Sequence, residues 1–291
     1  MAAWTFNEPW PNAAHGSILD YRGLPKMGYF WVRDALQMRD ASLEYYDPFV
    51  TADGARPLGS SAGGTMSIWA DSELAVATPA WGVTLDIFYV NGSRADGDRP
   101  EIHRIPGGQL PPSRSLRLAH VRFVPPLTAV GQVLLVRLSM HAVAPPATAR
   151  RGHPPLASPS SLLAQHTYAF AVVCNGSNST SVRAPLHPLL RPPLARLSAS
   201  AHRDAHSGAV TVRVTVASEG AAAHYVKLTL RMGPARPPLP FVRWSRSMFT
   251  LLPGEEDVEA VGSQALPGAE LAKMACVEAW NAERVCAAIR W

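Results

Sequence analysis

Val210-Thr211-Val212-Arg213-Val214-Thr215-Val216 alternates valine with polar residues along its whole length. Because successive side chains of an extended strand point to opposite faces, this stretch places its valines on one face and its polar residues on the other. The pattern predicts a half-buried β-strand with one face on a hydrophobic core. Similar segments on both sides extend this prediction to most of the chain.

Short segments rich in β-branched and aromatic residues, separated by turn residues, predict the other strands. Two Pro-rich stretches interrupt them, and we interpret 141–165 as a long loop and 184–193 as a linker between domains. The roughly one hundred residues after the linker, with about seven strands, have the size of an immunoglobulin-like sandwich. The predicted strands are 66–69, 83–90, 115–124, 132–140, 168–174, 224–230, 241–248, 271–278 and 285–291.

The first 45 residues differ from the rest. Residues 2–6 have the composition of a short strand, and a loop rich in Pro, Asn and Gly follows to about Gly23. Pro25 suits the first turn of a helix, because its fixed φ is already helical and its missing N–H is not needed there. Apolar residues at three- and four-residue steps then predict one stripe on a helix that ends near Arg39. The stripe consists of Met27, Phe30, Trp31, Ala35 and Met38.

Composition argues against several classes of partner. Lys and Arg number 27 and Asp and Glu 22, which gives a formal net charge of +5. The positive charge is nearly all arginine, scattered rather than clustered with exposed aromatics, so we expect a solvated basic surface and no nucleic-acid partner. No run approaches the roughly 20 apolar residues that cross a bilayer, so we expect no membrane partner.

The three cysteines are too few for a disulfide framework, and no Cys/His spacing resembles a zinc site. We therefore expect neither a metal nor a cofactor. Cys276 and Cys286 could form a disulfide only if their strands are neighbours, and we expect buried free thiols instead.

The most informative motif is Trp4-Thr-Phe-Asn7-Glu8-Pro9-Trp10-Pro11-Asn12, continued by Asp20-Tyr21-Arg22-Gly23 and Pro25-Lys26. It resembles the eighth strand, the following loop and the eighth helix of the catalytic barrel in family 2 glycoside hydrolases, especially the β-mannosidase and exo-β-glucosaminidase branch. Arg22 departs from the pattern, where the family has a second aromatic residue. The resemblance implies that residues 1–45 are the last strand, loop and helix of a (β/α)8 barrel.

The resemblance also implies a sugar site. Active sites of such barrels lie at the C-terminal strand ends, where a flat indole can stack against the C–H face of a pyranose. Trp4 matches the tryptophan beneath the sugar at the cleaved position, and Asn7 and Trp10 would shape the rim of the pocket. The alternative is that Trp4 and Trp10 only fill the top layer of the barrel.

Asn7-Glu8-Pro9 has a second interpretation, because Asn-Glu-Pro also marks the acid/base carboxylate on strand four of related barrels. A retaining mechanism would then need a second carboxylate about 5–5.5 Å away, at another barrel strand end. One helix and then continuous β-structure follow instead. We therefore interpret Glu8 as a loop carboxylate near the sugar hydroxyls.

A second resemblance lies at the other end of the chain. The run from Phe241 to Glu256, with Leu251-Leu252-Pro253-Gly254-Glu255, resembles the last sandwich of the same branch. Pro253-Gly254 predicts a turn, Leu251 and Leu252 cap a core, and Glu255 starts the return strand. Two further stretches resemble the same last sandwich, namely 214–220 and Val277-Glu-Ala-Trp280-Asn281. The stretches 66–72 and 81–86 resemble the first sandwich after the barrel more loosely.

Together these patterns predict a mainly β protein with two immunoglobulin-like β-sandwiches in series, preceded by the last βα unit of a truncated barrel. The expected domains are 1–45 for the barrel remnant, 46–188 for the first sandwich with its loop at 141–165, and 189–291 for the second. The catalytic Glu pair of the family sits on barrel strands four and seven, which this sequence does not contain, so no catalytic residue is assigned. Met1 falls where a barrel strand should already be running, which suggests a truncated gene model, an excised fragment or a degenerate relative.

The resulting expectation is a C-terminal fragment of a retaining exo-β-glycosidase that acts on β-mannosides or β-glucosaminides, with carbohydrate and the missing barrel as partners. By itself the fragment should be inactive. The alternative is a non-catalytic carbohydrate-binding or scaffolding protein, which exposed coplanar aromatics would favour. Because each alternates with polar neighbours, we expect core positions for Trp69, Trp81, Trp244 and Trp280. The sequence leaves open the sugar, the linkage, the compartment and the oligomeric state.

Overall fold

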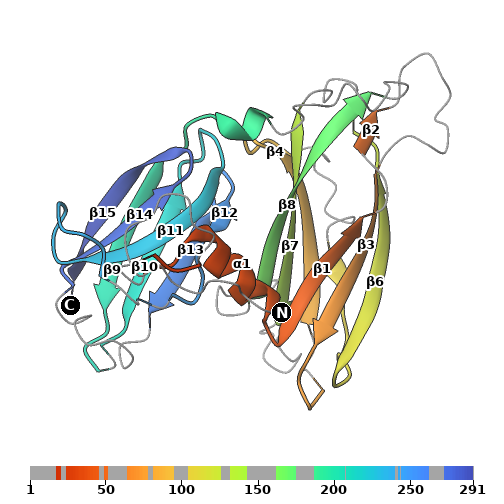
Figure 1. Ribbon diagram of the computed structural model, residues 1–291, viewed down its shortest axis with the longest axis horizontal. Helices are drawn as coiled ribbons and strands as arrows, with labels where there is room; N and C mark the ends of the chain where they lie inside the picture. The colour runs from red at the N-terminus through yellow and green to blue at the C-terminus, as the bar shows by residue number, and fades with distance from the viewer. Residues whose placement is uncertain are drawn as a thin grey trace, which may run out of the picture. The chain divides into compact units, whose positions relative to one another are not determined.

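A computed structural model of the chain is mainly β, with several sheets (Figure 1). Its contacts divide the chain into two compact units, each described by itself below. The middle unit is Gln37–Pro193, and the composite unit joins Met1–Leu36 to Leu194–Trp291. The structure describes residues 18–20, 24–45, 49–51, 64–77, 81–94, 104–125, 132–142, 162–174, 187–206, 208–239, 242, 244–261 and 272–290.

The middle unit contains two sheets with a shared core. The three-stranded sheet has the order β1-β3-β6, and the five-stranded sheet has the order β2-β8-β7-β4-β5. Buried residues of both sheets, such as Ile68 of β3 and Leu138 of β7, belong to one hydrophobic cluster. The strands are β1 (Arg39–Tyr45), β2 (Phe49–Thr51), β3 (Gly64–Ser72), β4 (Trp81–Tyr89), β5 (Arg104–Pro106), β6 (Arg114–Phe123), β7 (Val133–Ala142) and β8 (Leu162–Cys174), and a short 3-10 helix, η6 (His187–Leu190), follows.

Side-chain alternation explains why this core forms. Along β4, Val83, Leu85 and Ile87 are buried, whereas Thr84 and Asp86 between them are partly exposed. The β2 strand joins the five-stranded sheet by parallel pairing of Phe49 with Val172, and every other strand pair in the unit is antiparallel. The expected strand segments at 66–69, 83–90, 115–124, 132–140 and 168–174 are confirmed within one or two residues or as parts of longer strands.

The composite unit is built on a seven-stranded sheet, in the order β12-β11-β14-β15-β9-β10-β13. Its valine-rich strand β10 (Val210–Val216) is buried at alternate positions, as its sequence predicts. These valines share one hydrophobic cluster with Leu228 of β11 and Val277 of β14, so the sheet encloses its own core. The other elements are α1 (Met27–Ala35), β9 (Leu197–Arg203), β11 (Ala223–Arg231), β12 (Phe249–Leu251), β13 (Glu256–Val261), β14 (Met274–Ala279) and β15 (Ala282–Arg290).

Two connections, a turn and a parallel strand pairing, organise the composite unit. At Pro253-Gly254 the chain turns with Gly254 at φ 78°, a conformation that glycine adopts without strain, and the amide of Glu255 donates to the carbonyl of Leu252. The predicted turn, the buried Leu251 and Leu252, and the return strand are therefore confirmed. The second connection is the parallel pairing of β15 with β9, which joins Ile289 to Ala201 and Arg290 to His202.

Several expectations about elements are wrong. The described part of 241–248 forms no named strand, because Met248 has φ 61° and the strand begins only at Phe249. The helix ends at Ala35 rather than near Arg39, since Arg39–Tyr45 pairs with β3 as a strand of the middle unit. The expected loop at 141–165 is shorter at both ends, because β7 extends to Ala142 and β8 begins at Leu162.

The expectation that four tryptophans occupy core positions is wrong for Trp280. Trp81 and Trp244 are buried, and Trp69 is partly buried, with its Nε1 donating to Oε2 of Glu44 at 2.9 Å. Trp280 is 58% exposed, because it lies in the turn between β14 and β15, where strand alternation no longer applies.

Candidate functional site

The residues predicted to contact sugar lie outside the part of the chain that the structure describes. This holds for Trp4, Asn7 and Trp10, and also for Glu8. Their role as a sugar site therefore stays a prediction. The structure does describe the segment that follows them, from residue 18 through α1, with a gap at 21–23.

This segment is tied down by local hydrogen bonds and by one buried side chain. The amide of Leu24 donates to Oδ1 of Asp20 at 2.8 Å, and the amide of Lys26 donates to the carbonyl of Ile18 at 3.0 Å. Phe30 of α1 is buried and lines a small cavity of about 30 Å³ together with Lys227, Thr229 and Trp244. The helix therefore packs beside β11, within the composite unit.

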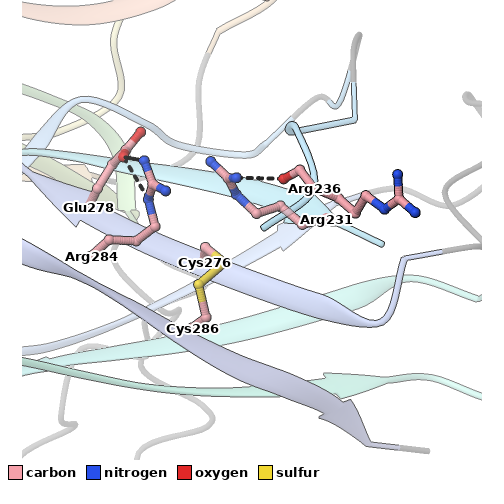
Figure 2. Close-up of a disulfide and its surroundings, with 6 residues drawn as sticks. All are labelled: Arg231, Arg236, Cys276, Glu278, Arg284 and Cys286. Carbon is pink, nitrogen blue, oxygen red and sulfur yellow. Dashed lines mark hydrogen bonds and ion pairs between the residues drawn. A yellow bond between two sulfur atoms is a disulfide. The ribbon is translucent and has the colours of Figure 1, made fainter. Parts of the chain in front are cut away.

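A disulfide joins Cys276 and Cys286 on adjacent strands (Figure 2). The two residues are direct partners in the antiparallel pairing of β14 with β15, with their Cα atoms 4.0 Å apart. The expectation of free thiols is therefore wrong. A signal for the pairing was present in the sequence, since the cysteines are equidistant from Asn281, the residue at the tip of this hairpin.

Charged residues surround the disulfide (Figure 2). Arg284 donates to Oε2 of Glu278 from Nη2 at 3.0 Å, and Arg231 donates from Nη1 to the carbonyl of Arg236 at 2.6 Å. Burial lowers the pKa of Arg231, and the positive charge of Arg284 lowers it further, against the opposing effect of Glu278. The Arg284–Glu278 pair joins β15 to β14, and the Arg231 contact joins the end of β11 to the loop that follows it.

Asn281 explains the Trp-Asn motif near the C-terminal end. Its buried side chain accepts from the amide of His224 at 3.0 Å and donates to the carbonyl of Ala222 at 2.8 Å. Its carbonyl accepts from the amide of Ala195 at 2.7 Å. One asparagine thus ties the hairpin to the beginning of the segment 194–291 and to β11, which is a structural role.

The middle unit carries a cluster of titratable groups between β1 and β8. Nε2 of His166 lies 2.6 Å from Oδ1 of Asp40, and the hydroxyl of Tyr168 accepts from the amide of Leu43 at 3.3 Å. Burial is the main reason that the pKa of Tyr168 rises to about 12; the Leu43 amide lowers it and the carboxylates of Asp40 and Asp71 raise it. These residues connect the two sheets of the unit and form no nucleophile–base pair that could be assigned to a reaction.

Within the described ranges, no group of three or more His, Cys, Asp or Glu side chains could hold a metal ion. None of the described helices is long and apolar enough to span a membrane. A larger cleft of about 360 Å³ lies on the outer side of β9, β10 and β15. Sequence reasoning missed it, because β15, which contributes Arg290, is far from β9 and β10 in the sequence.

No family model matches this sequence, and no curated protein matches it. Solved structures do. The crystal structure of the exo-chitosanase CsxA of Amycolatopsis orientalis aligns with 98% of this chain at a TM-score of 0.64 and 16% identity. The chain shares a fold with part of exo-chitosanase CsxA.

Two further structures of CsxA align with this chain to a similar degree. The exo-β-D-glucosaminidase CsxA, studied with a glucosamine-configured castanospermine and an amino-australine analogue, aligns at a TM-score of 0.65, and a complex with PNP-β-D-glucosamine aligns at 0.64. Both are 16% identical to this chain over 98% of its length. The chain spans 30% of the length of these solved proteins. At this identity the likeness concerns the fold, which is related to that of a glycoside hydrolase.

Proposed function

We propose that this chain is the C-terminal part of a retaining exo-β-glycosidase of family 2 that acts on β-glucosaminides or β-mannosides. The observation that carries the proposal is the alignment of nearly the whole chain with less than a third of an exo-β-D-glucosaminidase. The sequence resemblance at both ends of the chain supports the same family. In this proposal the chain provides the last barrel elements and two supporting domains, and the catalytic carboxylates belong to the remainder of the barrel.

We infer that both units contain immunoglobulin-like sandwiches. In the composite unit, β9, β10 and β13 lie on one side of the strand order and β12, β11, β14 and β15 on the other, which is the division of strands between the two sheets of such a fold. The middle unit has a corresponding division, with β1, β3 and β6 in one sheet. The helix α1 would be the last helix of the barrel, packed beside β11.

In this proposal Trp4, Asn7 and Trp10 bind the sugar at the cleaved position. An indole offers a pyranose ring an apolar floor, and Asn7 offers an amide to its hydroxyls. No catalytic role is proposed for any residue of this chain. Retaining hydrolysis needs two carboxylates about 5–5.5 Å apart across the scissile bond, and the described residues form no complete barrel on which to hold them.

The first test is an activity assay of the purified 291-residue chain with PNP-β-D-glucosamine and the corresponding mannoside. We expect no release of nitrophenol above the uncatalysed rate. Turnover that is abolished by Glu8→Gln would contradict the proposal and would make Glu8 the general acid of a complete site.

The second test transfers the segment 1–45 to an intact barrel of a similar exo-β-glucosaminidase. Trp4→Ala in this chimera should lower kcat/KM at least about tenfold, equivalent to about 1.4 kcal/mol of transition-state stabilisation. A chimera that also carries residues 194–291 provides a control, because Trp280→Ala removes an exposed indole at a hairpin tip and should leave kcat/KM unchanged. Unchanged activity of Trp4→Ala together with a lower melting temperature would mean that Trp4 only packs the barrel.

The alternative, a non-catalytic carbohydrate-binding protein, needs several exposed aromatic rings in one plane. Of the four tryptophans considered for this role, only Trp280 is exposed. These four tryptophans therefore favour the glycosidase proposal. Saturable binding of chitosan oligosaccharides that Trp280→Ala removes would reverse this preference.

A further inference from the structure

The cleft on β9, β10 and β15 gathers two arginines, a histidine and two hydroxyl side chains. Its described lining contains His202, Arg213 and Arg290, each exposed, together with the hydroxyls of Ser200 and Thr211. The sixth lining residue is Ala201. No described acidic residue lines this cleft.

Strand register explains why these residues converge. In β10, Val210, Val212 and Val214 face the core, so Thr211 and Arg213 face outward. The antiparallel pairing with β9 places His202 opposite Thr211 and Ser200 opposite Arg213. The parallel pairing of β15 with β9 places Arg290 next to His202. The three strands β15, β9 and β10 are consecutive in one sheet, whose ribbon is drawn in Figure 1, so hydrogen-bonded backbones fix the positions of these residues.

The side chains that line the cleft favour a negatively charged ligand. Arginine presents five N–H donors in a planar fork that fits the oxygens of a carboxylate, sulfate or phosphate. Arg213 of β10 and Arg290 of β15 lie on the two strands that flank β9, so they reach the cleft from opposite sides. Ser and Thr hydroxyls supply further donors, and a cleft of about 360 Å³ has the size of small-ligand sites. A cationic glucosaminide would be repelled here.

We propose that this cleft is a binding site for a small oxyanion, namely a phosphate, sulfate or carboxylate group, either free or carried by a sugar. Arg213 and Arg290 hold the anion from two sides, and Ser200 and Thr211 donate to its remaining oxygens. The proposal concerns the composite unit alone and does not depend on the proposed glycosidase function.

The test is a titration of the whole 291-residue chain, followed by backbone amide chemical shifts in NMR spectra at ~20 mM ionic strength, where charge interactions are weakly screened. The ligands are inorganic phosphate, glucose 6-phosphate and glucose. We expect saturable shifts in β9 and β10 with both phosphates and none with glucose. Equal affinity for the two phosphates would mean that the site recognises the bare anion, whereas tighter binding of glucose 6-phosphate would mean that it also recognises the sugar.

Arg213→Gln and Arg290→Gln should each weaken phosphate binding at least about fivefold, since each removes one charge-assisted contact. Arg284→Gln is the matched control: Arg284 is an exposed arginine on the same strand as Arg290, pairs with Glu278 and lies outside the cleft, so its loss should leave the affinity unchanged. Thr211→Glu adds a carboxylate to the cleft and should abolish binding, which provides a second variant if either Arg variant folds poorly. The proposal is overturned if phosphate produces no saturable shifts, if glucose binds as well as phosphate, or if Arg284→Gln weakens binding as much as the cleft variants.

Discussion

At the scale of single residues, the middle unit depends on a close approach of Gly107 to Trp81. Trp81 is fully buried, and a Cβ atom on Gly107 would lie 2.5 Å from both its ring carbon Cε3 and its carbonyl oxygen. Real Cβ contacts are not this short, so a side chain at residue 107 would force the backbone or the indole to move. Residue 107 must be glycine because a side chain has no room there, and not because of its backbone conformation.

Gly107→Ala should therefore destabilise the middle unit by about 1–3 kcal/mol, measured by urea unfolding. Gly108→Ala is the matched control, because nothing lies within 4 Å of the position of its Cβ. Equal effects of the two substitutions would show that the indole does not pack on Gly107.

Because of Tyr168, the free energy of unfolding of the middle unit should change with pH in the alkaline range. Its pKa in the folded state is about 12, above the value of 10.0 for an exposed tyrosine, because burial disfavours the phenolate. A raised pKa contributes stability that is fully present below pH 10 and is lost as the pH rises through 12. The wild-type chain should thus lose on the order of 2 kcal/mol between these values.

Tyr168→Phe removes the titrating hydroxyl and should flatten the pH dependence of the unfolding free energy between pH 10 and 12. It should also lower stability slightly at neutral pH, because the Leu43 amide loses its acceptor. Urea unfolding at several pH values measures both effects. A variant whose stability falls with pH as steeply as that of the wild-type chain would assign the dependence to other groups.

At the scale of elements, the strands with clear alternation could be predicted from the sequence, and those that depend on a partner could not. Val210–Val216 carries its burial pattern in its own residues. Arg39–Tyr45 has one buried residue, Ala41, and becomes a strand because β3 lies beside it, so its sequence lacks the signal. The stretch 241–248 shows the opposite error, since its aromatic residues suggest a strand although Trp244 is buried outside one.

The candidate sugar site depends on a different kind of information. Trp4, Asn7 and Trp10 were identified by resemblance to a family, and their geometry lies outside the described residues. By contrast, the cleft of Arg213 and Arg290 follows from the register of β9 with β10 and with β15, and β15 is far from both in the sequence. Composition shows that arginines are scattered along the chain, but only the fold shows which of them meet.

The helix α1 uses its apolar stripe only in part. Phe30 is 4% exposed, whereas Trp31 is 57% exposed and Ala35 is also exposed. Phe30→Ala should therefore lower the stability of the composite unit by about 3 kcal/mol, measured by denaturant unfolding. Trp31→Ala on the same helix is the control and should change the stability by less than about 0.5 kcal/mol. Comparable losses in both variants would mean that the exposed side of α1 is covered in solution.

At the scale of the whole molecule, the two units should unfold separately and respond differently to reductant. The disulfide lies in the composite unit and closes a short loop, with a sequence separation of 10. Its reduction should destabilise that unit by up to about 3 kcal/mol, by the entropy of loop closure. Calorimetry should show two transitions, of which dithiothreitol lowers only one. The double variant Cys276→Ala/Cys286→Ala should reproduce the lower transition and be insensitive to reductant; a shift of both transitions would mean that the units unfold together.

The discontinuous composite unit has a consequence for synthesis. On the ribosome, Phe30 leaves the exit tunnel long before β11, beside which it packs, has been translated. At about 5–20 residues per second this interval lasts on the order of 10–40 s, long enough for the middle unit to fold first. Throughout that time the apolar side of the nascent helix lacks its contact with β11, so this segment stays accessible to chaperones that bind exposed apolar segments.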